Sequence, residues 1–346
     1  MRDRAADLIL DWYDHHARDL PWRAAPQSRG HAALADPYHV WLSEVMLQQT
    51  TVAAVVPYFE KFVTRWPDVA ALAAAPEEEV MAAWAGLGYY SRARNLVKAA
   101  RAVSQAGGFP TTEAELRKLP GLGDYTAAAV AAIAFGRRAL VVDANVERVV
   151  ARLFAIEEPL PAGRKAIRAA LDTITPAKRA GDFAQAMMDL GSSLCRAREA
   201  QCLLCPWQAI CAARQGGDPT RLPVKAAKKA KSTRSGTAFW IERDGAVWLV
   251  RRAGKGMLGG MRALPDDGWS ARADGSEQAP IAGAWRAGGL VRHSFTHFHL
   301  ELGLAIHAGN SPAPEGEGEW WPVGQIEEAG LPTLFAKAAQ LALAEA

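Results

Sequence analysis

The spacing of apolar residues divides the chain into a helical part and a part that contains strands. Over residues 1–213 apolar residues recur at helical spacing, alanine is abundant, and glycine or proline separates the segments. Between His297 and His307, every second residue is Phe, Leu or Ile, as in a half-buried strand. The pattern predicts two domains, all-α over 1–213 and α+β over 235–346, joined by a glycine-, proline- and lysine-rich linker over 214–234.

Capping and turn residues predict the ends of several elements. Thr112 and Glu115 form a capping-box pair, so a helix begins there and ends at Pro120. Asp124 is the predicted N-cap of the next helix, which runs to about Phe135. In the second domain we expect a hairpin between 238–242 and 246–252, and a closing helix over 334–343.

The length and charge of the chain indicate a globular protein with one basic segment. The 346 residues suffice for two ordinary domains, and no apolar run is long enough to cross a membrane. The N-terminus lacks the features of a signal peptide, so we expect a cytoplasmic protein without membrane contact. The net charge is only +3, but basic residues gather where acids are few and predict either phosphate contacts or a solvated linker. They are Arg221, Lys225, Lys228, Lys229, Lys231, Arg234, Arg251, Arg252 and Lys255.

All four cysteines lie within one short segment. They read Cys195-x6-Cys202-x2-Cys205-x5-Cys211, whereas a disulfide framework would spread them across the fold. Four thiolates fit a 4Fe–4S cluster. A zinc ion is the alternative, although zinc sites more often use two separate Cys-x2-Cys pairs.

The segment 119–123 joins two predicted helices through a glycine-rich turn. Gly121 and Gly123 would let backbone N–H groups approach a phosphate at a helix N-terminus. An ordinary helix–helix turn is the alternative interpretation.

Two carboxylates follow or lie within apolar runs. Glu44 lies among apolar residues, which would raise its pKa and make it a general acid, unless it is a surface residue of an amphipathic helix. Asp143 could cap the next helix or provide the second carboxylate that glycosidic cleavage uses.

Five motifs in this order resemble the adenine DNA glycosylase (MutY) family of the helix–hairpin–helix superfamily, which includes endonuclease III. They are WLSEVMLQQT around Glu44, GLGYY at 86–90, LPGLG at 119–123, VDANV around Asp143, and the cysteine array. The resemblance covers nearly the whole chain. It implies an all-α helix–hairpin–helix glycosylase domain with an iron–sulfur cluster loop at 195–211, followed by an α+β Nudix-like domain that recognises 8-oxoguanine.

The resemblance implies a monofunctional glycosylase of base excision repair that removes adenine mispaired with 8-oxoguanine or guanine. Glu44 matches the glutamate that protonates adenine at N7, Asp143 the aspartate that stabilises or traps the sugar cation, and Asn145 the asparagine that holds water. Tyr125 stands where bifunctional lyases carry a lysine, so no Schiff base forms. The expected partner is double-stranded DNA with A:8-oxoguanine or A:G mispairs, and the enzyme is expected to be a nucleoid-associated monomer with a 4Fe–4S cluster.

Further positions match DNA-binding residues of the family. Arg23 and Gln185 match contacts to the flipped adenine. Gln49, Thr50, Leu87 and Tyr89 match the surface that probes the opposite base, where Leu87 and Tyr89 would otherwise be assigned to the core at a helix end. Phe295, Thr296 and His297 match the loop that reads 8-oxoguanine.

The chain departs from the family pattern in places. It is longer between Trp22 and Tyr38, and the second domain lacks the acidic box needed to hydrolyse nucleoside diphosphates. The sequence also allows two other functions. A lyase acting on oxidised pyrimidines is disfavoured by Tyr125, and a non-enzymatic DNA-binding protein with a redox-sensing cluster is disfavoured by the paired carboxylates.

Overall fold

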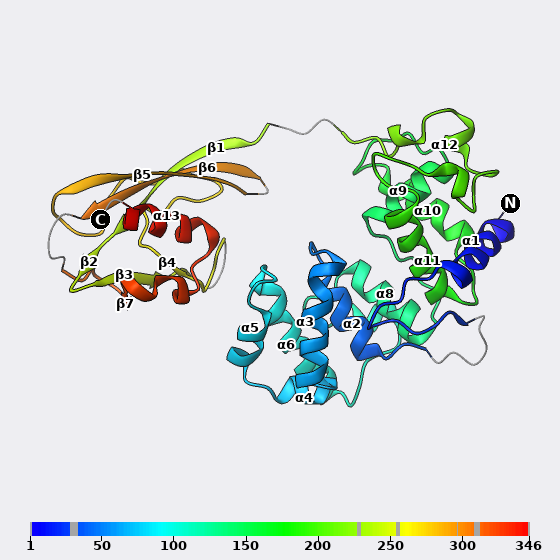
Figure 1. The fold of residues 1–346 in the computed structure, drawn as a ribbon, viewed down its shortest axis with the longest axis horizontal. Helices are drawn as coiled ribbons and strands as arrows, with labels where there is room; N and C mark the ends of the chain where they lie inside the picture. The colour runs from blue at the N-terminus through cyan, green and yellow to red at the C-terminus, as the bar shows by residue number, and fades with distance from the viewer. Residues whose placement is uncertain are drawn as a thin grey trace. The chain divides into compact units, whose positions relative to one another are not determined.

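The computed structural model describes residues 2–27, 34–226, 230–253, 257–295, 297–307 and 312–344. The chain divides into two compact units, Met1–Ala227 and Lys228–Ala346 (Figure 1). The boundary falls inside the segment predicted as a linker. No helix among the described residues is long and apolar enough to span a membrane.

The regular elements in the described part of the first unit are all helices, which confirms the predicted fold class. Alanine-rich segments with apolar residues at helical spacing form most of its elements. Its elements are α1 (Arg2–His16), α2 (Pro37–Met46), α3 (Val52–Arg65), α4 (Val69–Ala74), α5 (Glu77–Trp84), α6 (Tyr90–Gln105), α7 (Glu113–Leu116), α8 (Asp124–Phe135), α9 (Ala144–Leu153), α10 (Arg164–Ile174), α11 (Ala180–Ser193), η2 (Cys202–Leu204), α12 (Ala212–Gln215) and η3 (Pro219–Arg221).

These helices surround two hydrophobic cores. One core is built by α2–α8, and the other by α1 with α9–α11 and Trp207. Figure 1 shows α3–α6 at one end of the unit and α1, α9, α10 and α12 at the other, with α8 between them. Because α2 packs on α8 and α11 packs on both α8 and α9, the two cores meet along these helices.

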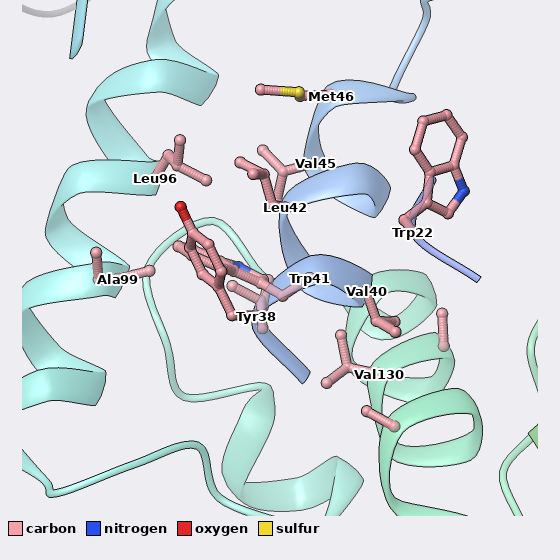
Figure 2. Packing of buried hydrophobic residues seen from close by; sticks show 14 of the residues in the cluster. Trp22, Tyr38, Val40, Trp41, Leu42, Val45, Met46, Leu96, Ala99 and Val130 are labelled. Carbon is pink, nitrogen blue, oxygen red and sulfur yellow. The ribbon is translucent and has the colours of Figure 1, made fainter. Parts of the chain in front are cut away.

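Helix α2 is buried on nearly every side. Asp36 caps it by accepting a hydrogen bond from the Tyr38 backbone N–H, and Pro37 occupies the first turn, where its missing N–H is tolerated. Figure 2 shows Tyr38 and Trp41 pointing toward α6 and Val40 pointing toward Val130 of α8. The polar residues Ser43 and Glu44 of this helix are therefore buried as well.

The predicted helix ends near the hairpin were only partly right. Thr112 caps α7 as expected, accepting from the Glu115 N–H, but this helix stops at Leu116 rather than at Pro120. Helix α8 ends at Phe135 as predicted, with Gly136 in the left-handed region. Its N-cap is Gly123, not Asp124. Asp124 is instead the first helical residue, and its carboxylate pairs with an arginine rather than with the backbone.

The second unit is an α+β fold, as predicted. Its elements are β1 (Ser232–Trp240), β2 (Glu242–Arg243), β3 (Ala246–Arg251), β4 (Arg262–Ala263), β5 (Trp285–Ser294), β6 (Phe298–His307), β7 (Glu319–Pro322), η4 (Val323–Ala329) and α13 (Thr333–Ala344). One sheet has the order β1-β6-β5, with β1 and β6 parallel; the other has β3 paired to β2, β4 and β7. Alternate residues of β6 are buried and pack with α13 in one core.

The predicted hairpin exists, but its first strand is much shorter. Only Glu242 and Arg243 pair with β3, and Asp244 and Gly245 turn the chain with positive φ angles of 50° and 72°. Residues 238–240 instead belong to β1 and pair with β6, because these apolar residues reach buried positions in the β1-β6-β5 sheet.

The described part of the predicted linker is largely structured. Leu222 is buried against the helical unit, and the Leu160 N–H donates to the Val224 carbonyl at 2.8 Å. The basic segment is also not a free array of cations, since several of its arginines pair with acids. These pairs are Arg221 with Glu157, Arg234 with Asp274, and Arg252 with Asp266.

Candidate active site

A pocket of about 800 Å³ lies where the two helical cores meet. Helices α2, α8 and α11 line it, together with the loop after α1 and the start of α9. Many of the residues singled out from the sequence lie in this one place. They are Arg23, Glu44, Gln49, Thr50, Gly121, Gly123, Tyr125, Asp143, Asn145 and Gln185.

Glu44 is the buried acid of this pocket. The residue is 6% exposed, which excludes the surface alternative. Burial raises the pKa of its carboxyl to about 7, and the neighbouring charge of Asp143 adds to this increase; a hydrogen bond with Tyr125 and the charge of Arg23 oppose it. Such a carboxyl holds its proton in roughly half of the molecules at neutral pH, so it can act as an acid.

Asp143 serves as a helix cap and lines the same pocket. Its Oδ1 accepts from the Val146 N–H at 2.7 Å, and its Oδ2 accepts from Asn145 Nδ2 at 2.9 Å. The capping interpretation is therefore confirmed, and the same carboxylate shares a pocket with Glu44. The cap fixes the carboxylate, and the second carboxylate oxygen is held on the side of Asn145.

Asn145 connects this carboxylate to the cysteine segment through Arg148. Arg148 Nη2 donates to Asn145 Oδ1 at 2.8 Å and to the Gly191 carbonyl at 2.6 Å, and its Nε donates to the Cys195 carbonyl at 2.8 Å. Arg148 was not singled out from the sequence, because its partners lie up to 47 positions away along the chain.

Arg23 is held by an acid that the sequence analysis missed. Both guanidinium Nη atoms bind Asp189 of α11, which is 1% exposed and also accepts from Arg18 Nε at 2.6 Å. The signal was present in the sequence as an aspartate within the apolar run Met187-Met188-Asp189-Leu190. Met188 was also missed. It lines the pocket, and its Sδ accepts a hydrogen bond from the Tyr125 hydroxyl at 3.3 Å.

The glycine turn before α8 leaves a helix N-terminus open. Gly121 has a φ of +78°, and a Cβ there would come within 2.7 Å of Asn95 Cβ, so only glycine fits. No atom lies within 4 Å of a Cβ built on Gly123, and no side chain caps the helix that follows. The free N–H groups of this terminus form the kind of site that binds a phosphate.

The predicted opposite-base residues fall into two groups. Gln49 is exposed with a φ of +60°, and Tyr89 is 58% exposed with a φ of +50°. Leu87, which was predicted to wedge the DNA, is instead only 6% exposed because it packs in the core with Trp84. The core alternative is therefore the right one for Leu87 in this structure.

The four cysteines line a common small cavity. Burial raises the pKa of Cys205 to about 12, a backbone hydrogen bond at Trp207 opposes this increase, and the charges of the other three cysteines add to it. No three His, Cys, Asp or Glu side chains in the described parts of the chain have the geometry to hold a metal ion. The donor set nevertheless fits a thiolate-ligated group, because Arg152 Nη1 donates to Cys195 Sγ at 3.3 Å and supplies positive charge.

In the second unit, Phe295 belongs to an aromatic group. Its ring stacks on Phe298, with centroids 4.8 Å apart, and meets His293 edge to face at 4.6 Å. Lys231 Nζ donates to the Phe295 carbonyl at 2.6 Å, and His297 is exposed. Thr296, the third predicted residue of this loop, lies outside the described residues, as do residues 28–33 of the longer N-terminal loop.

Comparisons with known proteins agree with this geometry. A family model described as the HhH-GPD superfamily of base excision DNA repair proteins matches residues 42–176, and a NUDIX domain model matches residues 237–341. The adenine DNA glycosylase of Homo sapiens is 34% identical over 397 aligned residues, which cover 95% of this chain and 72% of that protein. That of Arabidopsis thaliana is 34% identical over 85% of this chain and 51% of its own length.

Solved structures resemble the helical unit. A thermostable thymine-DNA glycosylase is 30% identical, covers 62% of this chain and 97% of its own, and gives a TM-score of 0.55. A trapped covalent intermediate of endonuclease III with DNA is 26% identical, covers 61% of this chain and 94% of its own, and gives a TM-score of 0.50.

Proposed function

The chain belongs to the adenine DNA glycosylase family of base excision repair enzymes, and from this premise we propose that it removes adenine mispaired with 8-oxoguanine or guanine. Its reaction is the hydrolysis of an N-glycosidic bond. The observation that carries the proposed mechanism is the buried Glu44, whose carboxyl has a pKa of about 7 and shares a pocket with Asp143.

In the proposed reaction Glu44 protonates the extruded adenine at N7. The proton makes the base a better leaving group, the bond between the sugar C1′ and N9 breaks, and both bonding electrons leave with the base. Flipping the base out of the duplex requires a few kcal/mol, least for a mispair. Arg23 and Gln185 line the same pocket and are proposed to contact this base.

Asp143 is proposed to offset the positive charge that develops on the sugar, or to trap it as a covalent adduct. Its fixed position as a helix cap favours this role, since a preorganised carboxylate needs no rearrangement when the cation forms. Asn145 is proposed to help hold the attacking water. The water oxygen then bonds to C1′, the bond from C1′ to Asp143 breaks and releases the carboxylate where an adduct has formed, and one proton of the water returns to Glu44.

Tyr125 supports base removal without strand cleavage. A phenol at this position offers no amine for a Schiff base, and the hydroxyl is instead engaged with Glu44 and Met188. The product is therefore proposed to be an abasic site on an intact strand.

Binding of double-stranded DNA is proposed to use three parts of the chain. The open N-terminus of α8 after Gly121 and Gly123 would bind a backbone phosphate, and Gln49, Thr50 and Tyr89 would contact the opposite base. Leu87 would need to leave the core to do the same. In the second unit Phe295, Thr296 and His297 are proposed to read 8-oxoguanine.

The cysteines are proposed to hold a 4Fe–4S cluster. Cys195, Cys202, Cys205 and Cys211 supply the four thiolate ligands that such a cluster needs. The cluster would order the loop between them and could carry electrons. We further propose that the enzyme acts as a monomer in the cytoplasm, at the nucleoid, where its substrate is found.

The test is a single-turnover assay on duplexes with adenine opposite 8-oxoguanine or guanine, with and without alkali. We expect excision from both, with breaks that appear only after alkali. Glu44→Gln should bind the duplex and lose excision, while the exposed Glu60→Gln on α3 should keep it. Breaks without alkali would indicate a lyase, and binding without any excision would indicate a non-enzymatic protein; near-normal excision by Glu44→Gln would remove Glu44 from the mechanism.

A further inference from the structure

Arg92, near the start of α6, links two segments that are distant in the sequence. Its Nη1 donates to three carbonyls at the end of α2 and just beyond it: Val45 at 3.0 Å, Met46 at 3.1 Å and Gln48 at 2.5 Å. The first of these carbonyls belongs to the residue that follows Glu44. Arg92 therefore binds the end of the helix that carries the buried acid.

The other arm of the same guanidinium binds the segment before α6. Nη2 donates to the Leu87 carbonyl at 3.2 Å and the Gly88 carbonyl at 3.5 Å, and to Thr50 Oγ1 at 3.4 Å. The guanidinium also lies over the Tyr89 ring, with 5.3 Å between its Cζ and the ring centroid. Arg92 thus joins the loop after α2 to the loop before α6.

Two of the carbonyls that Arg92 binds, those of Gln48 and Gly88, precede residues in an unusual backbone conformation. Gln48 precedes Gln49, with a φ of +60°, and Gly88 precedes Tyr89, with a φ of +50°. A non-glycine residue in the left-handed region is unfavourable and persists only when its surroundings fix it. The hydrogen bonds from Arg92 to the Gln48 and Gly88 carbonyls fix the peptide planes before Gln49 and Tyr89. The side chains of Gln49 and Tyr89 are both exposed.

We propose that Arg92 is a positioning residue that holds the opposite-base probes Gln49 and Tyr89 in fixed register with the helix carrying Glu44. The inference rests on the functions proposed above for these three residues. Insertion of Tyr89 into DNA would then present the extruded adenine to the acid at a set distance. Arginine is required because its planar guanidinium can donate to the two segments from two separate nitrogens, whereas the lysine side chain has a single nitrogen.

The test compares Arg92→Lys and Arg92→Gln with Arg101→Gln, a matched change on the same helix. Arg101 is exposed, and its Nε donates to the Ala73 carbonyl at 3.4 Å. In single-turnover excision the amplitude measures the fraction of active enzyme, and the rate constant measures the geometry of the bound state. We expect Arg92→Lys to keep its amplitude while its rate constant falls about 10- to 100-fold, with Arg92→Gln lower still and Arg101→Gln unchanged.

A second measurement follows base extrusion directly. 2-Aminopurine replaces the adenine opposite 8-oxoguanine, and its fluorescence rises when it leaves the stack. We expect Arg92→Lys to lower this signal at saturating enzyme, and Tyr89→Ala to lower it as well. A normal signal with Tyr89→Ala would refute the proposed role of Tyr89, whereas a reduced signal there and a normal one with Arg92→Lys would refute only the role of Arg92.

The remaining outcomes also decide the question. A rate constant for Arg92→Lys within about twofold of the unmodified enzyme overturns the proposal, whatever the amplitude. Loss of all active enzyme in both variants does so too, because it makes Arg92 a requirement of folding rather than of alignment.

Discussion

The carboxylate of Asp189 binds the guanidinium of Arg23 through both oxygens, at 2.7 and 3.0 Å. Arg23 also lies close enough to Glu44 for its charge to lower the pKa of that carboxyl. Because Asp189 offsets this positive charge, the pair lets Arg23 face the pocket without ionising the acid. The other groups that act on Glu44 are Tyr125, which lowers its pKa, and Asp143, which raises it.

Replacing Asp189 with Asn should therefore shift the pH dependence of excision. Since the pKa of Glu44 is about 7, the acid is protonated below that pH and excision falls as the pH rises through it. An unpaired Arg23 favours the ionised form, so the fall should move to lower pH. At a fixed pH above the pKa, a lower pKa of Glu44 reduces the protonated fraction, so we expect the rate constant to fall by up to about tenfold.

The measurement is the single-turnover rate constant of Asp189→Asn across the pH range in which Glu44 titrates. The variant also leaves a buried arginine unpaired, which should reduce the amount of folded enzyme. That loss changes the amplitude and not the midpoint of the profile. A midpoint equal to that of the unmodified enzyme would show that Asp189 has no electrostatic effect on Glu44.

Asp143→Asn should separate the two roles of this residue. Asparagine caps helices as well as aspartate does, so the free energy of unfolding should change by less than about 1 kcal/mol. The negative charge is lost, so excision should fall at least 100-fold, by about the factor found when one preorganised electrostatic group is removed. Denaturant unfolding and single-turnover excision measure the two effects; parallel losses in both would leave Asp143 with a structural role alone.

Arg152→Gln should destabilise the cysteine loop. The side chain of Arg152 is 1% exposed and donates to the carbonyls of Leu222, Arg196 and Ala197 at 3.0, 2.7 and 3.0 Å. Removing these charged donors leaves buried carbonyls unpaired, so the free energy of unfolding should fall by about 3 kcal/mol.

Iron and sulfide content should fall together with stability in this variant, because Arg152 also orders the loop that carries the ligands. Arg196→Gln changes an exposed arginine of the same loop and is the control. Full iron content and unchanged unfolding in Arg152→Gln would contradict the prediction.

Gly121→Ala should impair the hairpin, whereas Gly123→Ala should leave the fold intact. Alanine at 121 would have to adopt a φ of +78° and place its Cβ within 2.7 Å of Asn95 Cβ, while position 123 has open space. We expect the alanine at 121 to reduce stability by about 1–2 kcal/mol. Binding to undamaged duplex, measured by fluorescence anisotropy, should weaken with it; equal stability of the two variants would count against this account of the turn.

The elements that depend on neighbouring residues were predictable from the sequence. The cap at Thr112, the end of α8 at Gly136 and the turn at Asp244 and Gly245 each follow from side chains a few positions apart. The alternation in β6 likewise predicted which of its residues are buried. The site residues Glu44 and Asp143 were found by their motifs, and the structure places them in one pocket.

Other features depend on residues that meet only when the chain folds. Asp189 reaches Arg23 across 166 positions, and Arg92 reaches Val45 across 47, so neither pair leaves a local pattern. The same holds for the burial of Leu87 and for the pairing of β1 with β6. Local sequence thus determined several caps and turns and the candidate chemical groups, but not every element end, as the early stop of α7 shows. Tertiary packing decided which charges are neutralised and which side chains are exposed, because burial and charge pairing depend on distance in space rather than along the chain.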